Sequence, residues 1–451
     1  MRSRLAILLG FLLLLFSDFA RAKAGLQGSF ALSMGWTDNA LNGVSQPAPG
    51  QPGRFNDFFA EVRPSLILSS GSARAVQTVS YAFDSLLYFR LTSTDTYSNQ
   101  LLWSGYFLPS ARTQVLVAAS LIQGKLNMFN AQILGTTGIA ALATGATGYV
   151  GPGLNQQFSL EMTEHWRFSQ TLAFQSFLPY DSPTLSKNFI VDQNFIFDYS
   201  WRRDALGIRA RVNYSLFDQV YGRIDNGDGT FLANALISPR RQQIIDELGL
   251  RWRHDHGHFW TSELQLGVVQ AMRANDGGGQ IWQPAGMAAM RYTRPIFNGE
   301  LSFRHTVQSD AFAGATFAVD QVLLTAALPL GQKSRSSLGV SGSYSHGRLI
   351  DLQSGFATST NHLFVADAGL STRPVDWLTL MLRYSLVTQL GDSSAAMPLP
   401  TVRRDVILLS VSGVYPPAPV ATVPSREALR VDRSDQPTIP EPHSKPYVPQ
   451  E

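Results

Sequence analysis

Long segments of this sequence alternate between apolar and polar residues. From Leu206 to Ser215, the even positions are apolar or aromatic and the odd positions are Gly, Arg, Asn or Ser. The same alternation recurs around Leu250, Phe303 and Leu382. Because successive side chains of a β-strand point to opposite faces, the pattern predicts strands with one apolar and one polar face.

The length of the alternating segments separates two kinds of all-β fold. They run for about 10 to 16 residues, whereas strands of soluble proteins cluster near five or six. Strands that cross a membrane need about 9 to 11 residues and are flanked by aromatic girdles. Aromatic residues lie near the segment ends at Trp36, Phe107, Trp166, Tyr199, Trp201, Trp252, Trp260, Tyr292, Trp377 and Tyr415.

Eighteen such segments can be delimited. They lie near residues 27–37, 55–69, 74–92, 97–108, 112–122, 154–166, 168–178, 188–202, 204–217, 241–254, 258–273, 279–294, 298–308, 316–329, 335–346, 360–372, 375–389 and 402–415. Every second connection is a tight turn, for example at Arg203-Asp204, His165-Trp166-Arg167 and Arg373-Pro374. The alternate connections, such as 123–153 and 218–240, are mostly longer, with 93–96 as an exception.

This sorting of turns by parity predicts the fold class. Short periplasmic turns alternating with longer outer loops, together with an even strand number, are typical of outer-membrane barrels. A soluble two-sheet sandwich has no reason to sort its loops in this way. We therefore predict an all-β protein with a single closed antiparallel transmembrane barrel of 18 strands, with 16 to 20 allowed, and with 123–153 and 218–240 on the outer side.

The composition agrees with a membrane barrel and excludes several functions. Charged residues make up 15% of the chain, compared with about 25% in ordinary globular domains. The chain has no cysteine, which excludes disulfides, zinc–thiolate sites and cysteine nucleophiles. A net charge of +3 over 451 residues gives no support to nucleic-acid binding, so no nucleic-acid partner is expected.

The two ends of the chain differ from the alternating region. Arg2 and Arg4 precede an apolar run and an A-x-A site, which predicts a cleavable signal peptide over residues 1–24. We expect the barrel over residues 25–415. Residues 416–451 hold nine of the 24 prolines, which predicts a disordered Pro-rich arm on the periplasmic side.

The signal peptide, the long alternating strands and turns such as Arg373-Pro374-Val375-Asp376-Trp377-Leu378 resemble those of large porin-type outer-membrane barrels. The resemblance covers about residues 25–415. It implies a bacterial outer-membrane location and contact with outer-membrane lipid. The chain departs from the family habit of ending at an aromatic residue of the last strand, because 36 residues follow Tyr415.

The polar faces of the strands hold the candidate functional residues. Charges are tolerated in a wet lumen, whereas a charge that faces mid-bilayer lipid costs roughly 2 to 4 kcal/mol. The arginine excess among these residues predicts a mild preference for anions. By alternation we place in the lumen Arg63, Arg90, Arg209, Arg211, Arg251, Arg253, Arg291, Arg304, Arg383, Arg404, Glu61, Asp84, Glu161, Asp198, Glu247, Glu263, Glu300 and Asp367.

Motifs for other chemistry are weak. His254, His256 and His258 cross a predicted turn at Gly257, which spoils a metal-binding geometry. The stretch 225–230 resembles a calcium loop but lacks a closing glutamate, so we interpret it as a tight turn. No Gly-x-Ser-x-Gly elbow appears, and His305 and His362 fall on apolar-face positions. We therefore expect no cofactor, no metal and no enzymatic activity.

The predicted function is a channel that passes hydrophilic material across the outer membrane. The Pro-rich arm suits docking onto a periplasmic partner, and the arginines suit an acidic chain, which favours export of a polymer such as an exopolysaccharide. The alternatives are a passive small-solute porin, a non-conducting structural barrel closed by the 123–153 loop, and an outer-membrane hydrolase. Architecture alone does not separate these alternatives.

Overall fold

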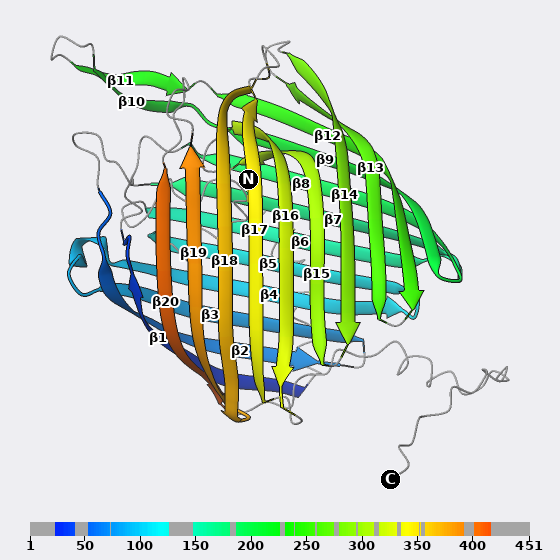
Figure 1. The fold of residues 1–451 in the computed structure, drawn as a ribbon, viewed down its shortest axis with the longest axis horizontal. Helices are drawn as coiled ribbons and strands as arrows, with labels where there is room; N and C mark the ends of the chain where they lie inside the picture. The colour runs from blue at the N-terminus through cyan, green and yellow to red at the C-terminus, as the bar shows by residue number, and fades with distance from the viewer. Residues whose placement is uncertain are drawn as a thin grey trace, which may run out of the picture.

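In a computed structural model, the chain forms one closed antiparallel barrel of 18 strands (Figure 1). The structure describes residues 23–40, 53–72, 74–125, 148–180, 186–225, 231–238, 240–257, 259–274, 279–294, 296–310, 315–331, 335–350, 352, 357–391 and 401–415. The barrel strands are β1 (Lys23–Thr37), β2 (Asp57–Gly71), β3 (Ala75–Tyr88), β4 (Thr96–Ser110), β5 (Thr113–Lys125), β6 (Gly148–Glu161), β7 (Trp166–Pro179), β8 (Asn188–Trp201), β9 (Asp204–Phe217), β12 (Arg241–Gly257), β13 (Trp260–Arg273), β14 (Gln280–Arg294), β15 (Phe297–Asp310), β16 (Ala315–Leu330), β17 (Ser336–Ile350), β18 (Ala357–Val375), β19 (Leu378–Gly391) and β20 (Val402–Tyr415).

Each strand pairs with its neighbours along the chain, and the first and last strands close the ring. β1 pairs with β2 on one side and with β20 on the other, so that Gly28 lies opposite Tyr415. β9 pairs directly with β12. The predicted closed 18-strand antiparallel barrel is therefore confirmed.

The alternation of the sequence maps onto two different environments. Leu248 and Leu250 on β12 are 63% and 61% exposed on the outer face, whereas Glu247, Gly249 and Arg251 lie on the inner face. Comparable exposed apolar side chains occur on the outer face of every barrel strand, among them Leu26, Leu66, Leu266 and Leu409. An apolar outer surface of this size is stable in contact with lipid tails, whereas in water it would stay exposed at a cost in free energy.

The two rims of the barrel differ. At one rim, hereafter the short-turn rim, Arg202 and Arg203 join β8 to β9, and the other rim, hereafter the long-loop rim, carries the longer connections. Aromatic side chains gather near the short-turn rim, where the Trp166 ring lies 4.7 Å from that of Phe197 and the Trp260 ring lies 4.7 Å from that of Tyr292. Such a girdle marks the level of the lipid headgroups.

The long-loop rim holds two short elements that alternation did not indicate. A 3-10 turn (Thr92–Thr94) lies between β3 and β4. Residues 218–240, predicted as a loop, contain the hairpin of β10 (Val220–Asp225) and β11 (Phe231–Ser238), as Figure 1 shows. The sequence predicted this stretch only as a long outer connection, because strands that pair only with each other need no lipid-facing alternation.

One strand and one turn were misplaced. The sixth strand, predicted over 154–166, is β6 at Gly148–Glu161. Its first residues include Gly151, Pro152 and Gly153, which read as a loop but lie extended between β5 and β7. The turn predicted at His165-Trp166-Arg167 spans 162–165 instead, and the Thr163 hydroxyl oxygen accepts a hydrogen bond from the Trp166 backbone N–H at 3.1 Å.

The barrel wall is interrupted between β14 and β15. Their pairing ends at Gly286 and His305, although both strands continue toward the long-loop rim. Beyond this point Val307 and Ala318, which continue the outward alternation of β15 and β16, are buried. They cluster with Ile245 from the inner face of β12, so two parts of the wall lie one over the other.

Hydrogen bonds between distant strands confirm this overlap. The Ser309 hydroxyl on β15 donates to the Asn213 side-chain oxygen on β9 at 3.5 Å, and the Thr316 hydroxyl on β16 donates to Gln243 on β12. Along an ordinary sheet, β9 and β15 would stand about four spacings of roughly 4.8 Å apart. Contact at hydrogen-bond distance therefore requires the sheet to fold over itself.

Four sequence-based predictions fall wholly or largely outside the described residues. They are the signal peptide up to residue 22, the central part of the 123–153 loop over 126–147, the tight turn at 225–230 beyond residue 225, and the Pro-rich arm over 416–451. Within the described part of the chain, no helix has the length and apolar character needed to cross a membrane.

Candidate functional site

A cluster of charged side chains lies on the inner wall from β8 to β15. We call it the lumen cluster. It consists of four guanidinium groups and four carboxylates, all on strand positions that alternate with exposed apolar residues of the outer face. Its members are Arg209, Arg211, Arg251, Arg304, Asp192, Asp198, Glu247 and Glu263.

Two arginines of β9 form one half of the cluster. Arg211 donates from Nε to Asp192 Oδ2 on β8 at 2.8 Å, and its Nη1 lies 3.7 Å from Glu247 Oε2 on β12. Arg209 donates from Nη1 to Gln265 Oε1 on β13 at 2.7 Å and lies 3.3 Å from Glu247 Oε1. Glu247 therefore lies between two guanidinium groups.

The Arg209 side chain reaches across β12 to β13 because the inner positions between them are glycines without side chains. Arg209 lies opposite Gly249 on β12, and Gly249 lies opposite Gly267 on β13. A β-carbon at residue 249 would come within 2.9 Å of the Leu266 carbonyl oxygen. The two glycines thus leave a path along the wall for a long side chain.

Arg251 forms the other half of the cluster. It donates from Nε to Glu263 Oε1 at 2.8 Å and from Nη2 to Glu263 Oε2 at 3.1 Å, so β13 binds it through both carboxylate oxygens. Its Nη1 donates to Asp198 Oδ2 on β8 at 2.7 Å. Such bidentate pairs fix the orientation of a guanidinium as well as its charge.

The cluster is balanced in charge. Arg304 on β15 is close enough to Arg209 and Arg211 for their charges to act on it, which brings the count to four arginines and four carboxylates. These pairs brace the wall and neutralise one another. The lumen cluster therefore contributes no net charge to the inner wall.

Other predicted lumen residues form smaller groups on the inner wall. Arg383 donates to Asp367 at 3.0 Å, Arg291 to Glu300 at 2.9 Å, and Arg63 to Gln100 at 2.9 Å. Glu61 lies beside Asp84 and Arg63. The remaining inner-face residues are Arg253, which is exposed toward the short-turn rim, Arg404, which is buried toward the long-loop rim, and Glu161, opposite Arg167.

Arg90 does not lie on the inner wall. β3 ends at Tyr88, so the alternation that placed Arg90 in the lumen no longer applies, and its side chain is exposed in the connection to β4. The backbone N–H of Arg90 donates to the Asp57 carboxylate at 2.9 Å. The alternating pattern continues past the end of the strand, so strand parity does not place the Arg90 side chain in the lumen.

The sequence analysis did not identify three residues that contact the arginines of the lumen cluster. Asp192 occupies an inner position of β8 in the segment Asp192-Gln193-Asn194, and Asn194 accepts a hydrogen bond from Arg209 at 2.7 Å. Both residues share the inner parity of Asp198, which would have identified them. Gln265 is also an inner residue, but its bond to Arg209 depends on the neighbouring glycines and has no sequence signal of its own.

Four polar residues form a row on the outer face. His305, Asp320, His346 and His362 lie directly opposite one another on β15 to β18. His305 Nδ1 is 2.5 Å from Asp320 Oδ1, and the rings of His346 and His362 are stacked 4.7 Å apart. Of the residues that the structure describes, no three His, Asp or Glu side chains are arranged to hold a metal ion.

The histidine run near Gly257 also forms ordinary hydrogen bonds. His254 Nδ1 lies 2.7 Å from Asp204 Oδ1, and His256 Nε2 lies 2.8 Å from Ser262 Oγ. Gly257 has a φ of 73°, as expected for a turn, and residue 258 lies outside the described part of the chain.

The lumen differs between its two halves. Toward the long-loop rim, every barrel strand has at least one buried inner residue, including Phe59, Tyr149, Phe177, Phe217 and Gln389. Toward the short-turn rim, some inner residues such as Arg253 are exposed, whereas Asp198 and Glu263 of the lumen cluster are buried. Buried inner residues therefore occur on every strand only toward the long-loop rim.

Comparisons with known proteins add solved structures only. No family model and no curated protein matches the sequence. The chain is similar to Pseudomonas aeruginosa OpdL, with 11% identity, 87% of this chain and 99% of that chain covered, and a TM-score of 0.44. It is also similar to P. aeruginosa OccK2 (OpdF) in complex with glucuronate (11%, 87% and 98%, 0.43) and to the siderophore receptor PirA from Acinetobacter baumannii (7%, 86% and 80%, 0.44).

The barrel itself identifies the class of protein. A closed sheet with an even number of strands has no edge whose backbone N–H and C=O groups would lack hydrogen-bond partners in the bilayer. The outer face of this sheet is apolar, and its inner wall is charged. The short-turn rim is the periplasmic side of such barrels. The chain is a large transmembrane β-barrel of the bacterial outer membrane.

Proposed function

We propose that this barrel passes small hydrophilic solutes across the outer membrane by passive diffusion. The observation that carries the proposal is the charged inner wall inside an 18-strand ring. Barrels of 16 to 18 strands enclose enough space for an aqueous channel. A lumen lined with ion pairs and amides holds water, which a hydrophilic solute needs along its path.

Small solutes suit this lumen better than a polymer. Inner side chains are buried toward the long-loop rim on every strand, which favours a narrow passage at that level. A polymer in transit would need a wide bore along its whole length. Polymer export was predicted from the Pro-rich arm, which lies outside the described residues, so a docked periplasmic export partner remains a prediction.

We further propose a mild anion preference carried by arginines outside the lumen cluster, chiefly Arg253. Its side chain is exposed on the inner wall near the periplasmic rim, where it meets entering ions. The reversal potential in a KCl gradient should shift toward cations for Arg253→Glu. The wider set Arg209, Arg211, Arg251, Arg253, Arg304 and Arg383 was predicted to act as the filter, and an unchanged reversal potential after reversing them would exclude that role.

Solute uptake into liposomes tests the proposed function. Vesicles containing the purified barrel should swell in isosmotic solutions of a monosaccharide or small amino acid, and swelling should fall steeply for oligosaccharides of increasing length. Equal permeation of monosaccharides and long oligosaccharides would favour a polymer pathway. No swelling with any solute would favour the closed structural barrel.

A further inference from the structure

The inner wall has an uncharged hollow on β4 to β7. It has a volume of about 220 Å³, and its lining includes Ala118, Ser120, Gly153 and Ala173. Three adjacent cross-strand rows of inner positions meet there, and most of these positions hold small residues. The glycine-rich start of β6, which made the strand hard to predict, is what creates the space.

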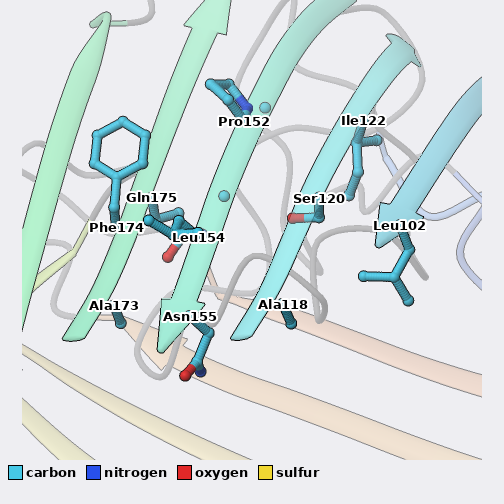
Figure 2. A pocket seen from close by; sticks show the side chains of 12 residues that line it. Leu102, Ala118, Ser120, Ile122, Pro152, Leu154, Asn155, Ala173, Phe174 and Gln175 are labelled. Atoms are coloured by element: carbon cyan, nitrogen blue, oxygen red, sulfur yellow. The ribbon is translucent and has the colours of Figure 1, made fainter. Parts of the chain in front are cut away.

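The floor of the hollow is tightly built. Gly153 lies between Ser120 on β5 and Gln175 on β7. A β-carbon at residue 153 would come within 2.6 Å of Ser120 Oγ, so the hydroxyl occupies the space above the glycine. Figure 2 shows the Ser120 hydroxyl directed toward β6, with Gln175 on the far side of that strand.

The lining combines apolar contacts with neutral hydrogen-bonding groups. Leu102 is 45% exposed although it occupies an inner position opposite Ser120, which is unusual on a polar wall. Ile122 lies on the same side, and the Ser120 hydroxyl and the amides of Asn155 and Gln175 supply polar groups (Figure 2). None of the residues lining the hollow is charged.

The rings of Tyr149 and Phe177 lie next along β6 and β7, on the long-loop side of the hollow. They lie 5.3 Å apart, both are buried, and both occupy inner positions adjacent to the hollow. A solute that enters from the periplasmic side therefore meets apolar side chains with neutral polar groups beside them, and the two aromatic rings lie beyond it toward the long-loop rim.

We propose that this hollow binds a single uncharged pyranose ring as a subsite of the channel, an inference that rests on the proposed function. A pyranose has an apolar C–H face to cover Leu102 and hydroxyl groups for Ser120, Asn155 and Gln175. Sites for drug-sized ligands measure about 300 to 1,000 Å³, so the smaller hollow suits one ring and not a chain of sugars. The lack of charge selects against acidic and amino sugars.

Binding can be measured without conduction, by saturation-transfer NMR of D-glucose with the barrel in detergent micelles. Transfer should reach the ring C–H protons of glucose and be much weaker for sorbitol, which has hydroxyls but no ring. Ala173→Phe fills the hollow and should weaken glucose binding about tenfold or more, a factor that corresponds to about 1.4 kcal/mol. Ser343→Phe, on an inner position of β17, adds the same ring to the opposite wall and should leave binding unchanged.

A second variant guards against misfolding of the first. Asn155→Leu removes one hydrogen-bonding group without closing the hollow and should also weaken glucose binding. Transfer to glucose that is absent, equal to that of sorbitol, or unaffected by both variants would overturn the inference. If the barrel binds glucose but vesicles fail to swell, the proposed function fails and the subsite stands. If vesicles swell without glucose binding, only the subsite fails.

Discussion

Arg251 on β12 binds Asp198 on β8 across the strand that separates them, with 2.7 Å between Nη1 and Oδ2. The residue of β9 that lies opposite both of them is Gly207. The absence of a side chain at this position lets the guanidinium pass over β9. The ion pair therefore depends on a glycine that takes no part in it.

Adding a methyl group at residue 207 should break the ion pair between Arg251 and Asp198. In Gly207→Ala, the new β-carbon would overlap the Asp198 carboxylate and lie 2.8 Å from the Phe197 carbonyl oxygen. We expect a loss of about 1 to 3 kcal/mol in unfolding free energy, the usual cost of overpacking. Thermal unfolding followed by circular dichroism in micelles measures it. Gly339→Ala is the control, because its β-carbon would come no closer than 4.0 Å to any neighbour, and equal destabilisation of both variants would contradict the argument.

Removing the guanidinium of Arg251 should leave two carboxylates without their partner. Arg251→Met should lower the unfolding free energy by about 1.5 to 3 kcal/mol, the range for hydrogen bonds to charged groups. Arg253→Met serves as the control, because Arg253 shares the strand and face but is exposed. In the double variant Arg251→Met/Asp198→Asn, the loss should be smaller than the sum of the single losses. Additive losses would show that the two residues do not interact.

Val307 tests the overlap of the wall beyond the β14–β15 pairing. Its outward parity predicts a lipid contact, whereas it is 1% exposed and clusters with inner-face residues of β12, β13 and β14. Val307→Ala removes two carbons from a packed site and should cost about 1 to 2 kcal/mol of unfolding free energy. Phe303→Ala, on the same face but 46% exposed, should cost less despite the larger deletion. A larger loss of unfolding free energy for Phe303→Ala than for Val307→Ala would mean that Val307 faces lipid.

Truncation after Tyr415 tests the role of the Pro-rich arm. β20 ends at Tyr415 and already closes the ring through its pairing with β1, so the barrel should assemble normally without residues 416–451. Heat-sensitive migration on a gel and surface labelling of cells measure assembly. Failed assembly would show that the arm is needed to close the barrel. Normal assembly with a loss of transport would support the docking arm.

The sequence predicted the barrel well because alternation is a property of each strand alone. The segments 204–217 and 402–415 coincide with β9 and β20, since lipid on one side and water on the other impose strict parity. β6 was misplaced because its glycines and proline mimic a loop while they serve to keep the inner wall thin. Local composition cannot distinguish these two uses of glycine.

The partners within the lumen could not be predicted in the same way. Parity places Arg251 on the inner face, but its bond to Asp198 depends on the register of three strands and on Gly207 between them. The overlap at Val307 depends on where the pairing of β14 with β15 stops, which no alternating pattern records. These features arise from contacts between segments that are distant in the sequence.

Single-channel recording of the purified barrel in planar lipid bilayers tests directly whether the ring encloses a water-filled passage. We expect stepwise ion currents that scale with the salt concentration and persist at low voltage. Insertion of folded barrels without any current steps would contradict this expectation, because the charged inner wall would then line a closed core.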